Sequence, residues 1–116
     1  MALGNYEAVL KAAGDPARAR MLKLLEGREL CVCELTGILG LSQATVSGHL
    51  SILKNAGLVG DKRNGRRVYY SLADRKRNDY ALPMLALLLG WLDDDAQVRS
   101  DRRRLSAMLA KKGTDA

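Results

Sequence analysis

The chain has 116 residues and a net charge of +6 at pH 7, and 47% of its residues are hydrophobic. This length predicts one domain with a thin core, and the hydrophobic content excludes a disordered chain. Phe is absent, so the core must consist mainly of Leu, Ala, Val and Ile, a composition that favours helices.

The chain carries no recognisable targeting segment. Its first residues lack the continuous apolar stretch of a secretory signal, and its longest apolar run, residues 81–92, is too short to span a bilayer. We therefore expect a cytoplasmic protein without a membrane partner. In that compartment the two cysteines would stay reduced, so a disulfide framework is not expected.

The positive charge is concentrated in one segment. From Asp61 to Asp79 there are seven Lys or Arg residues against three Asp, a local charge of +4. A basic patch on a small domain favours a polyanionic partner, with nucleic acid as the first choice. The alternative is a solvated face that only keeps the protein soluble, and composition does not decide between the two.

The N-terminal part has the periodicity of helices. Apolar residues repeat every three or four positions from Tyr6 to Ala13, which predicts a helix over about residues 4–13. A second helix is predicted to follow at once. Asp15 would be its N-cap and Pro16 its first residue, where the missing N–H of proline has no consequence.

Two short helices with a tight turn come next. We expect the first from residue 32 or 33 to 39 and the second from residue 43 to 55 or 56, with Ser42 as the cap of the second. This pattern predicts a helix-turn-helix over about residues 33–56. The apolar stripe of the second helix consists of Val46, Leu50 and Leu53.

After Gly57 the hydrophobic pattern changes from helical to alternating. The segment "LVGDKRNGRRVYYSL" predicts two strands with a turn centred on Asn64 and Gly65, because both residue types tolerate positive φ. A basic hairpin directly after a helix-turn-helix is typical of a wing, here over about residues 58–72.

The C-terminal part contains a helix that is apolar nearly all round, "PMLALLLGWL". Such a helix must be buried on all sides, and one small domain can hardly enclose it, so a partner subunit is expected to cover it. We therefore predict a single winged helix-turn-helix domain over residues 1–116, mainly α with a small β-hairpin. It would form a homodimer through terminal helices at about residues 4–13 and 82–110.

The second helix of the pair has a face suited to reading DNA. Its exposed positions carry short polar side chains, which can reach base edges and phosphates in a major groove. Taken alone, this is also the pattern of an ordinary amphipathic helix, and the neighbouring basic hairpin favours the DNA interpretation. The expected DNA-binding residues are Ser42, Gln43, Thr45, Ser47, Ser51, Arg63, Arg66, Arg67 and Tyr69.

The two cysteines stand in "LCVCEL" at the start of the helix-turn-helix. Cys31 and Cys33 would lie about 200° apart around a regular helix, so they can share an ion only if Cys31 precedes the helix and Cys33 lies in its first turn. A helix N-terminus favours thiolates, which bind soft ions. Small buried hydrophobic residues and a redox pair are the alternatives, and a disulfide across one intervening residue ranks lower because it is strained.

The segments "LCVCEL", "LSQATVSGHLSILKNAGLV" and "RNGRRVYYSL" together resemble the ArsR/SmtB family of winged-helix repressors, over about residues 6–92. The cysteine pair is similar to that of the arsenical-resistance members. This resemblance implies a homodimeric repressor of an inverted-repeat double-stranded DNA operator, released when As(III) or Sb(III) binds Cys31 and Cys33. No cofactor and no enzymatic activity are implied.

The sequence departs from that family pattern at several positions. Thr36 stands where the arsenic sensors have a third cysteine, and Gly48 replaces a larger residue on the recognition helix. Residues 81–101 contain no histidine, which excludes the zinc site of other members. The third ligand is therefore expected to be a small thiol or water. His49, the only histidine, is expected to make a structural hydrogen bond within the helix-turn-helix.

The sequence suggests how an ion would act. An ion that bridges the two cysteines would distort the first helix of the pair, which positions the recognition helix. An alternative within the same family is a repressor that senses oxidation or another soft metal ion through the same cysteines. A winged-helix adaptor that binds protein is a further alternative, which the basic hairpin disfavours.

Overall fold

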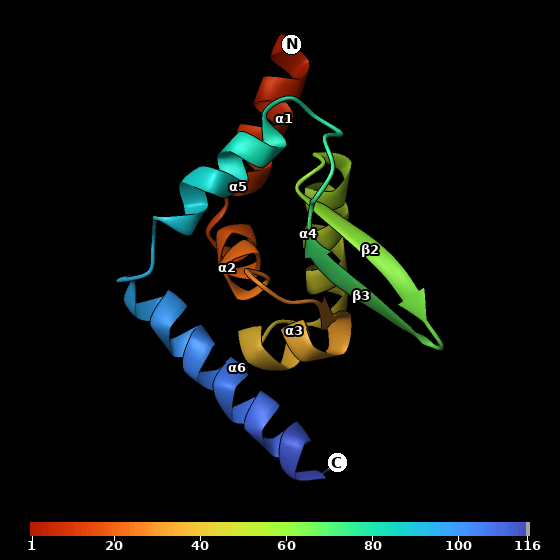
Figure 1. The fold of residues 1–116 in the computed structure, drawn as a ribbon, viewed down its shortest axis with the longest axis vertical. Helices are drawn as coiled ribbons and strands as arrows, with labels where there is room; N and C mark the ends of the chain where they lie inside the picture. Colours follow the sequence, from red (N-terminus) through yellow and green to blue (C-terminus); the bar gives the residue numbers. More distant parts are fainter. Residues whose placement is uncertain (116) are drawn as a thin grey trace.

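Six helices and three short strands make up the computed structural model, which describes residues 1–115 and their side chains as far as Lys112 (Figure 1). In chain order the elements are α1 (Leu3–Gly14), α2 (Pro16–Leu24), β1 (Leu30–Cys31), α3 (Val32–Leu39), α4 (Gln43–Asn55), β2 (Val59–Asn64), β3 (Arg67–Leu72), α5 (Ala81–Leu89) and α6 (Ala96–Asp115).

The helix boundaries follow local capping signals. The Asp15 carboxylate accepts a hydrogen bond from the Arg18 N–H at 3.1 Å, and Pro16 occupies the first position of α2, as predicted. Gly40 ends α3 with a φ of 68°, which a residue with a side chain rarely adopts. The Ser42 hydroxyl then accepts from the Thr45 N–H at 3.1 Å and starts α4.

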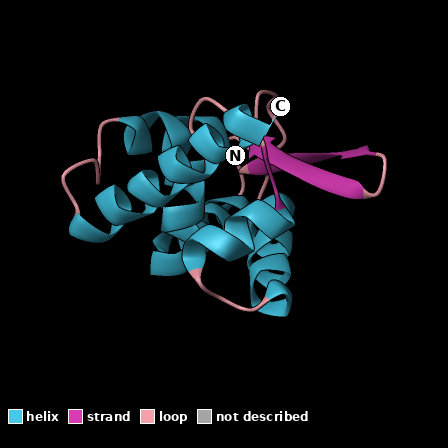
Figure 2. Cartoon of the chain, turned by 90° about the horizontal axis from the view of Figure 1, so that it is seen from below, coloured by secondary structure: helices cyan, strands magenta, loops and turns pink. Residues whose placement is uncertain are grey.

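The core lies between α2, α3 and α4. The predicted stripe of α4, Val46, Leu50 and Leu53, has no solvent exposure, and it packs into a cluster of buried side chains from α2 and α3. Figure 2 shows that the two long strands project away from this helical body. The predicted winged helix-turn-helix is confirmed.

The sheet has one strand more than the sequence predicts. The strand order is β1-β3-β2, and β1 pairs with β3 through Leu30 with Tyr70 and Cys31 with Tyr69. The hairpin turn is also displaced by one residue. Asn64 pairs with Arg67, so Gly65 and Arg66 are the central residues, and Gly65 alone of these takes a positive φ, of 67°.

The C-terminal part consists of two helices. The helix α5 ends near Gly90, where the buried ammonium group of Lys23 donates to the Leu88 carbonyl at 2.6 Å and pairs with Asp93 at 3.0 Å. The helix α6 then packs against α2 and α3 of its own chain (Figure 1). No helix within residues 1–115 is long and apolar enough to span a membrane.

A single chain does not enclose α5, as the sequence predicts. Leu87 and Leu89 are 51% and 59% exposed, and Trp91 just beyond the helix is 52% exposed. The cause is the shortness of the domain: α5 has a neighbour on one side, where Ala81, Leu85 and Leu88 are buried, and none on the other.

Candidate nucleic-acid interface and cysteine site

The outward face of α4 is polar and exposed. Ser42, Gln43, Thr45, Ser47 and Ser51 all lie on the surface. The Ser42 and Thr45 hydroxyls are 2.8 Å apart at the N-terminus of α4, where free N–H groups and the helix dipole favour an anion. Side chains of this kind can contact phosphates at the start of a helix and base edges along its length.

One apolar residue interrupts this region. Ile52 of α4 is 45% exposed, although the sequence predicts short polar side chains at the exposed positions of this helix. The exposure of Ile52 could have been predicted from the sequence, because Ile52 follows the exposed Ser51 and does not belong to the buried stripe of Val46, Leu50 and Leu53. A side chain of this kind can contact a thymine methyl group or a sugar.

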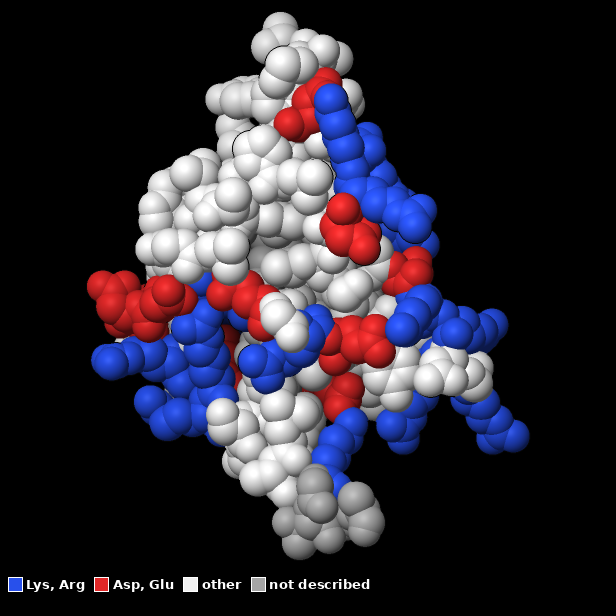
Figure 3. Space-filling model, in the orientation of Figure 1, with Lys and Arg blue, Asp and Glu red and all other residues white. Residues whose placement is uncertain are grey.

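The hairpin carries the basic residues of the predicted wing. Arg63, Arg66 and Arg67 are exposed, and Tyr69 is half-buried. Figure 3 shows Lys and Arg side chains along the hairpin edge of the molecule. Lys62 on the same strand pairs with Glu29 at 3.3 Å, so part of the local charge is neutralised within the chain.

His49 connects α4 to the corner between α1 and α2. The Arg18 guanidinium donates to His49 Nδ1 at 3.2 Å, to the Ala12 carbonyl at 2.8 Å and to the Lys11 carbonyl at 3.1 Å. His49 thus makes the structural hydrogen bond that the sequence predicts, but its partner lies on α2, outside the helix-turn-helix pair. The same arginine satisfies carbonyls at the end of α1.

The two cysteines lie at the junction of β1 and α3. Cys31 is buried and extended, with φ −83° and ψ 164°, and it is the N-cap of α3, whereas Cys33 is exposed in the first turn. The chain therefore changes direction between them. Because of this change the sulfurs converge, as the interpretation as an ion site requires.

The structure joins the cysteines in a disulfide, which corrects the expectation that they stay reduced. Their Cα atoms are 5.4 Å apart, inside the range that disulfides span. The sequence ranked a disulfide low because a bridge across one intervening residue is strained. The extended conformation of Cys31 removes that obstacle, since it places Cys31 outside the helix.

Glu34 completes the N-terminus of α3 and was not identified from the sequence. The Cys31 N–H donates to Glu34 Oε1 at 2.9 Å, and the Glu34 N–H donates to Cys31 Sγ at 3.4 Å. This is a capping box with cysteine in the usual place of serine. The sequence contained a signal for this capping box, because the acidic Glu34 stands three positions after the N-cap Cys31.

The Glu34 carboxylate also pairs with Lys112 of α6. Burial raises the pKa of this carboxyl, but the hydrogen bond from Cys31, the charge of Lys112 and the charge of Arg67 together outweigh burial and lower the pKa below 4.5. Glu34 is therefore ionised at neutral pH. Its charge lies directly beside the cysteine site.

Cys31 and Cys33 would supply two soft donors once their disulfide is reduced, and the chain has no third cysteine. Within residues 1–115 no group of three or more His, Cys, Asp or Glu side chains is placed to hold a metal ion. The Thr36 hydroxyl oxygen is buried without a hydrogen-bond partner, one turn along α3 from Cys33. A thiophilic ion with room for an outside ligand fits this donor set better than zinc.

A helix pair with a capped recognition helix, followed by a basic hairpin, defines a winged helix-turn-helix protein of the kind that binds DNA. The sequence model of "Bacterial regulatory protein, arsR family" matches residues 15–60. Arsenic resistance transcriptional regulator ArsR2 of Pseudomonas putida is 39% identical over 93 residues, which cover 76% of this chain and 80% of that protein. The chain belongs to the ArsR family, a family of regulatory proteins and not of enzymes.

Two further relatives place the similarity. Arsenic resistance transcriptional regulator ArsR1 of Pseudomonas putida is 53% identical over 66 residues, 55% of this chain, and the match spans only 51% of the length of ArsR1. The solution structure of the homodimeric winged helix-turn-helix domain Mb0332 of Mycobacterium bovis matches with a TM-score of 0.65 and 31% identity. That match covers 76% of this chain and 78% of the Mb0332 chain.

Proposed function

We propose that this protein is a homodimeric DNA-binding repressor of transcription that leaves its operator when As(III) or Sb(III) binds Cys31 and Cys33. The observation that carries the proposal is the position of the two sulfurs. They meet at the N-terminus of α3, the helix that supports the recognition helix α4. The names of ArsR1 and ArsR2 support the choice of a metalloid.

The DNA side of the proposal uses the surfaces described above. The α4 face from Gln43 to Ser51 would enter the major groove, with Ser42 and Thr45 near a phosphate. Arg63, Arg66 and Arg67 of the hairpin would contact the backbone beside the site, and Tyr69 would support them. These contacts make affinity fall as salt rises, because each phosphate contact releases counterions.

The dimer is proposed to form through α1 and α5. Their outward apolar side chains are unusually exposed for one chain, and Figure 3 shows an uncharged surface over this region. The exposed apolar side chains are Leu3, Tyr6, Leu10, Leu87 and Leu89. The tail segment α6 is already packed on its own chain, so within residues 82–110 we assign the contact to α5.

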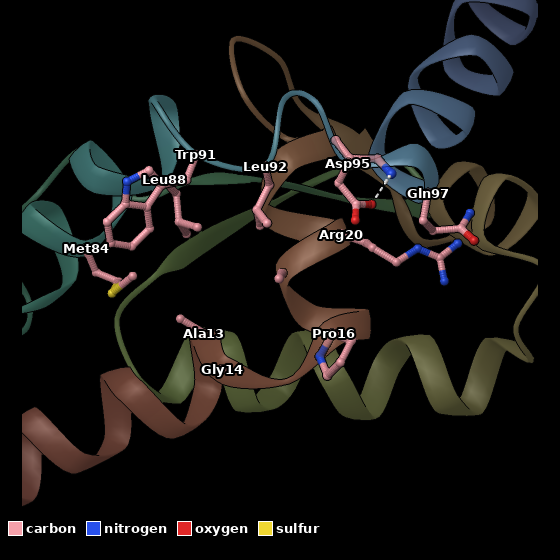
Figure 4. A pocket seen from close by; sticks show the side chains of 12 residues that line it. Ala13, Gly14, Pro16, Arg20, Met84, Leu88, Trp91, Leu92, Asp95 and Gln97 are labelled. Atoms are coloured by element: carbon pink, nitrogen blue, oxygen red, sulfur yellow. Dashed lines mark hydrogen bonds between the residues drawn. The ribbon is translucent and has the colours of Figure 1, made fainter.

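A cavity next to this surface supports the same assignment. It has a volume of about 560 Å³ and lies between the α1–α2 corner and the α5–α6 corner (Figure 4). Ala13, Met84, Leu88 and Trp91 are among the residues that line it. A second copy that covers α5 would also cover the exposed Trp91. Two α4 helices in such a dimer would read half-sites about one DNA turn apart, which is an inverted repeat.

The chemistry at the cysteines begins from two thiols. Arsenous acid, As(OH)₃, reacts with both of them to form two As–S bonds and releases two molecules of water, so one hydroxyl stays on arsenic. A small thiol can replace that hydroxyl with loss of a third water. In the disulfide, Cys31 Sγ accepts from the Glu34 N–H. When the sulfur binds arsenic it would turn toward the ion, and we expect the first turn of α3 to move with it. Since α3 packs on α4, the recognition helix changes its position.

Fluorescence anisotropy tests this proposal, with the DNA upstream of the protein's own gene and a thiol reductant that keeps the cysteines reduced. Arsenite should weaken operator binding by about 5- to 150-fold, the usual range of coupling between two sites. The double variant C31S/C33S should bind the operator normally and ignore arsenite. Unchanged affinity of the reduced wild type in arsenite would reject the metalloid proposal.

The disulfide supports a second candidate, a repressor that senses oxidation. A peroxide would oxidise the two thiols to the disulfide, taking two electrons and two protons and leaving two molecules of water. In this case peroxide, and not arsenite, would release the operator. Adding a reductant would then restore operator binding. Cd(II), tested in parallel, would show whether another soft metal ion releases the operator instead of arsenite or peroxide.

A further inference from the structure

The helix α6 holds α3 at both ends. Near the N-terminus of α3, Lys112 pairs with the Glu34 carboxylate. Near its C-terminus, Arg104 Nη1 donates to the Ile38 carbonyl at 3.1 Å. Between these two contacts Leu105 of α6 is buried in the core, at 3% exposure. The helix that carries Cys33 is therefore held from outside by charged side chains as well as by packing.

The other side of α6 is fixed to α2. Asp101 is buried and accepts from Arg20 Nε at 2.8 Å and from Arg20 Nη2 at 2.9 Å. Arg102 pairs with Glu26 at 3.0 Å just beyond α2. A bidentate arginine–carboxylate pair with one partner buried holds a fixed geometry. Because α6 is anchored on α2, it can resist a movement of α3 instead of following it.

The contact of Lys112 reaches the cysteine site through one residue. Glu34 uses one carboxylate oxygen for the Cys31 N–H and the other for Lys112. Its own N–H is directed to Cys31 Sγ. The capping box and the Lys112 contact are both present with Cys31 in the disulfide. A change that turns the Cys31 side chain away from this position would therefore alter the capping box, and Glu34 would pass the change on to Lys112.

We propose that Lys112 and Arg104 are positioning residues of the cysteine site, and that α6 is the brace against which α3 shifts when the disulfide of Cys31 and Cys33 is exchanged for free thiols or for a bound ion. This inference rests on the proposed function for its biological meaning. The brace itself is a property of the folded chain. Without the contacts of α6, only the first turn of α3 would move when the cysteines change state, and the position of α4 would change less.

The chain offers matched controls for both positions. Lys111 is the exposed neighbour of Lys112, and Arg103 is the exposed neighbour of Arg104. The variants K112Q and K111Q remove the same charge from adjacent positions, and R104Q and R103Q do the same about two turns earlier in α6. K112R keeps the charge and should restore the contact with Glu34.

Hydrogen exchange of the α3 backbone amides tests the brace first. In the protein with the disulfide intact, K112Q and R104Q should raise the exchange rate of α3 amides by about tenfold, because each loses one charge-assisted hydrogen bond that the structure shows in this state. K111Q, R103Q and K112R should match the wild type. Equal exchange in K112Q and K111Q would overturn the assignment of Lys112.

Operator release tests the coupling. The ratio of operator dissociation constants with and without arsenite should shrink by about threefold or more in K112Q, and K112R should restore it. A ratio in K112Q equal to that in K111Q would overturn the coupling. If arsenite has no effect on the wild type, the metalloid proposal fails. The coupling is then tested by the ratio of operator dissociation constants with and without peroxide. The exchange comparison stands in either case.

Discussion

Two regions of the molecule differ in how completely one chain buries their apolar side chains. In the helix-turn-helix, Val46, Leu50 and Leu53 have no exposure at all. In the terminal helices, Leu3 of α1 is 84% exposed and Leu87 of α5 is 51% exposed. The helix-turn-helix is thus fully packed in one chain, whereas α1 and α5 leave apolar side chains uncovered, where we propose the dimer contact. The stability of the helix-turn-helix against unfolding should not depend on protein concentration. The stability of the packing of α1 and α5 should rise with protein concentration.

The largest effect is expected in the core of the helix-turn-helix. Leu50→Ala removes a fully buried side chain and should lower the free energy of unfolding by about 3–4 kcal/mol, as for other buried leucines. Urea denaturation at several protein concentrations measures it. Ile52→Ala on the same helix is the control and should change stability by less than about 1 kcal/mol. Similar losses at both positions would contradict the burial described here.

The second effect should appear in the terminal helices. Leu87→Glu places a charge in the proposed dimer contact and should weaken self-association by at least about 100-fold, because a buried unpaired charge is strongly unfavourable. Sedimentation velocity measures the association. Leu109→Glu places the same charge on α6, at a residue that is 39% exposed, and should leave the dimer intact. If L87E leaves the dimer unaffected, the dimer contact does not include α5 at Leu87.

The third effect joins the two regions. Arg18 donates to the Ala12 carbonyl at the end of α1 and to His49 on α4. Arg18→Gln should lower the free energy of unfolding by about 1–2 kcal/mol, since acceptors are left unpaired. Thermal unfolding gives the value, with Arg28→Gln, an exposed position, as the control. Loss of operator affinity beyond the loss of stability would show that α1 also helps to place α4.

A smaller effect is expected at the wing. Arg66→Gln should remove one phosphate contact, reduce the slope of log affinity against log salt by about 1, and weaken binding equally for all DNA sequences. Operator titrations at four salt concentrations measure the slope. A change confined to one operator sequence would instead indicate that Arg66 reads a base.

The smallest effect concerns acid stability. The pKa of Glu34 is lowered in the folded protein, although burial opposes this, because Cys31 and Lys112 stabilise the carboxylate. Its contribution is therefore complete above pH 4.5, the ordinary pKa, and is lost as pH falls through the lower folded value. Glu34→Gln should flatten the decline of stability in acid. An unchanged pH profile in E34Q would mean that other carboxylates cause it.

Local signals predicted the parts of this fold that depend on neighbours in sequence. The caps at Asp15 and Ser42 and the stripe of α4 follow from residues three or four positions apart. The pairing of Leu30 with Tyr70 joins residues far apart in the chain, and two residues are too few to show a strand pattern. The hairpin turn was displaced because Gly65, and not Asn64, supplies the positive φ.

The cysteine site was predicted only in part, because some of its contacts join neighbours in the sequence and others join residues far apart. The sequence suggested that Cys31 precedes the helix, and the structure places it there as the N-cap. Lys112 lies 78 residues from Glu34, and no periodicity connects the two. Such a pair depends on how α6 packs against α3, which only the assembled core determines.

The central claim is that capture of a soft ion by Cys31 and Cys33 and binding of the operator oppose each other. Arsenite affinity of the reduced protein, measured with and without saturating operator DNA, tests it most directly. Linkage requires the operator to weaken arsenite binding by the same factor by which arsenite weakens operator binding. Arsenite that binds both forms with equal affinity would contradict the account.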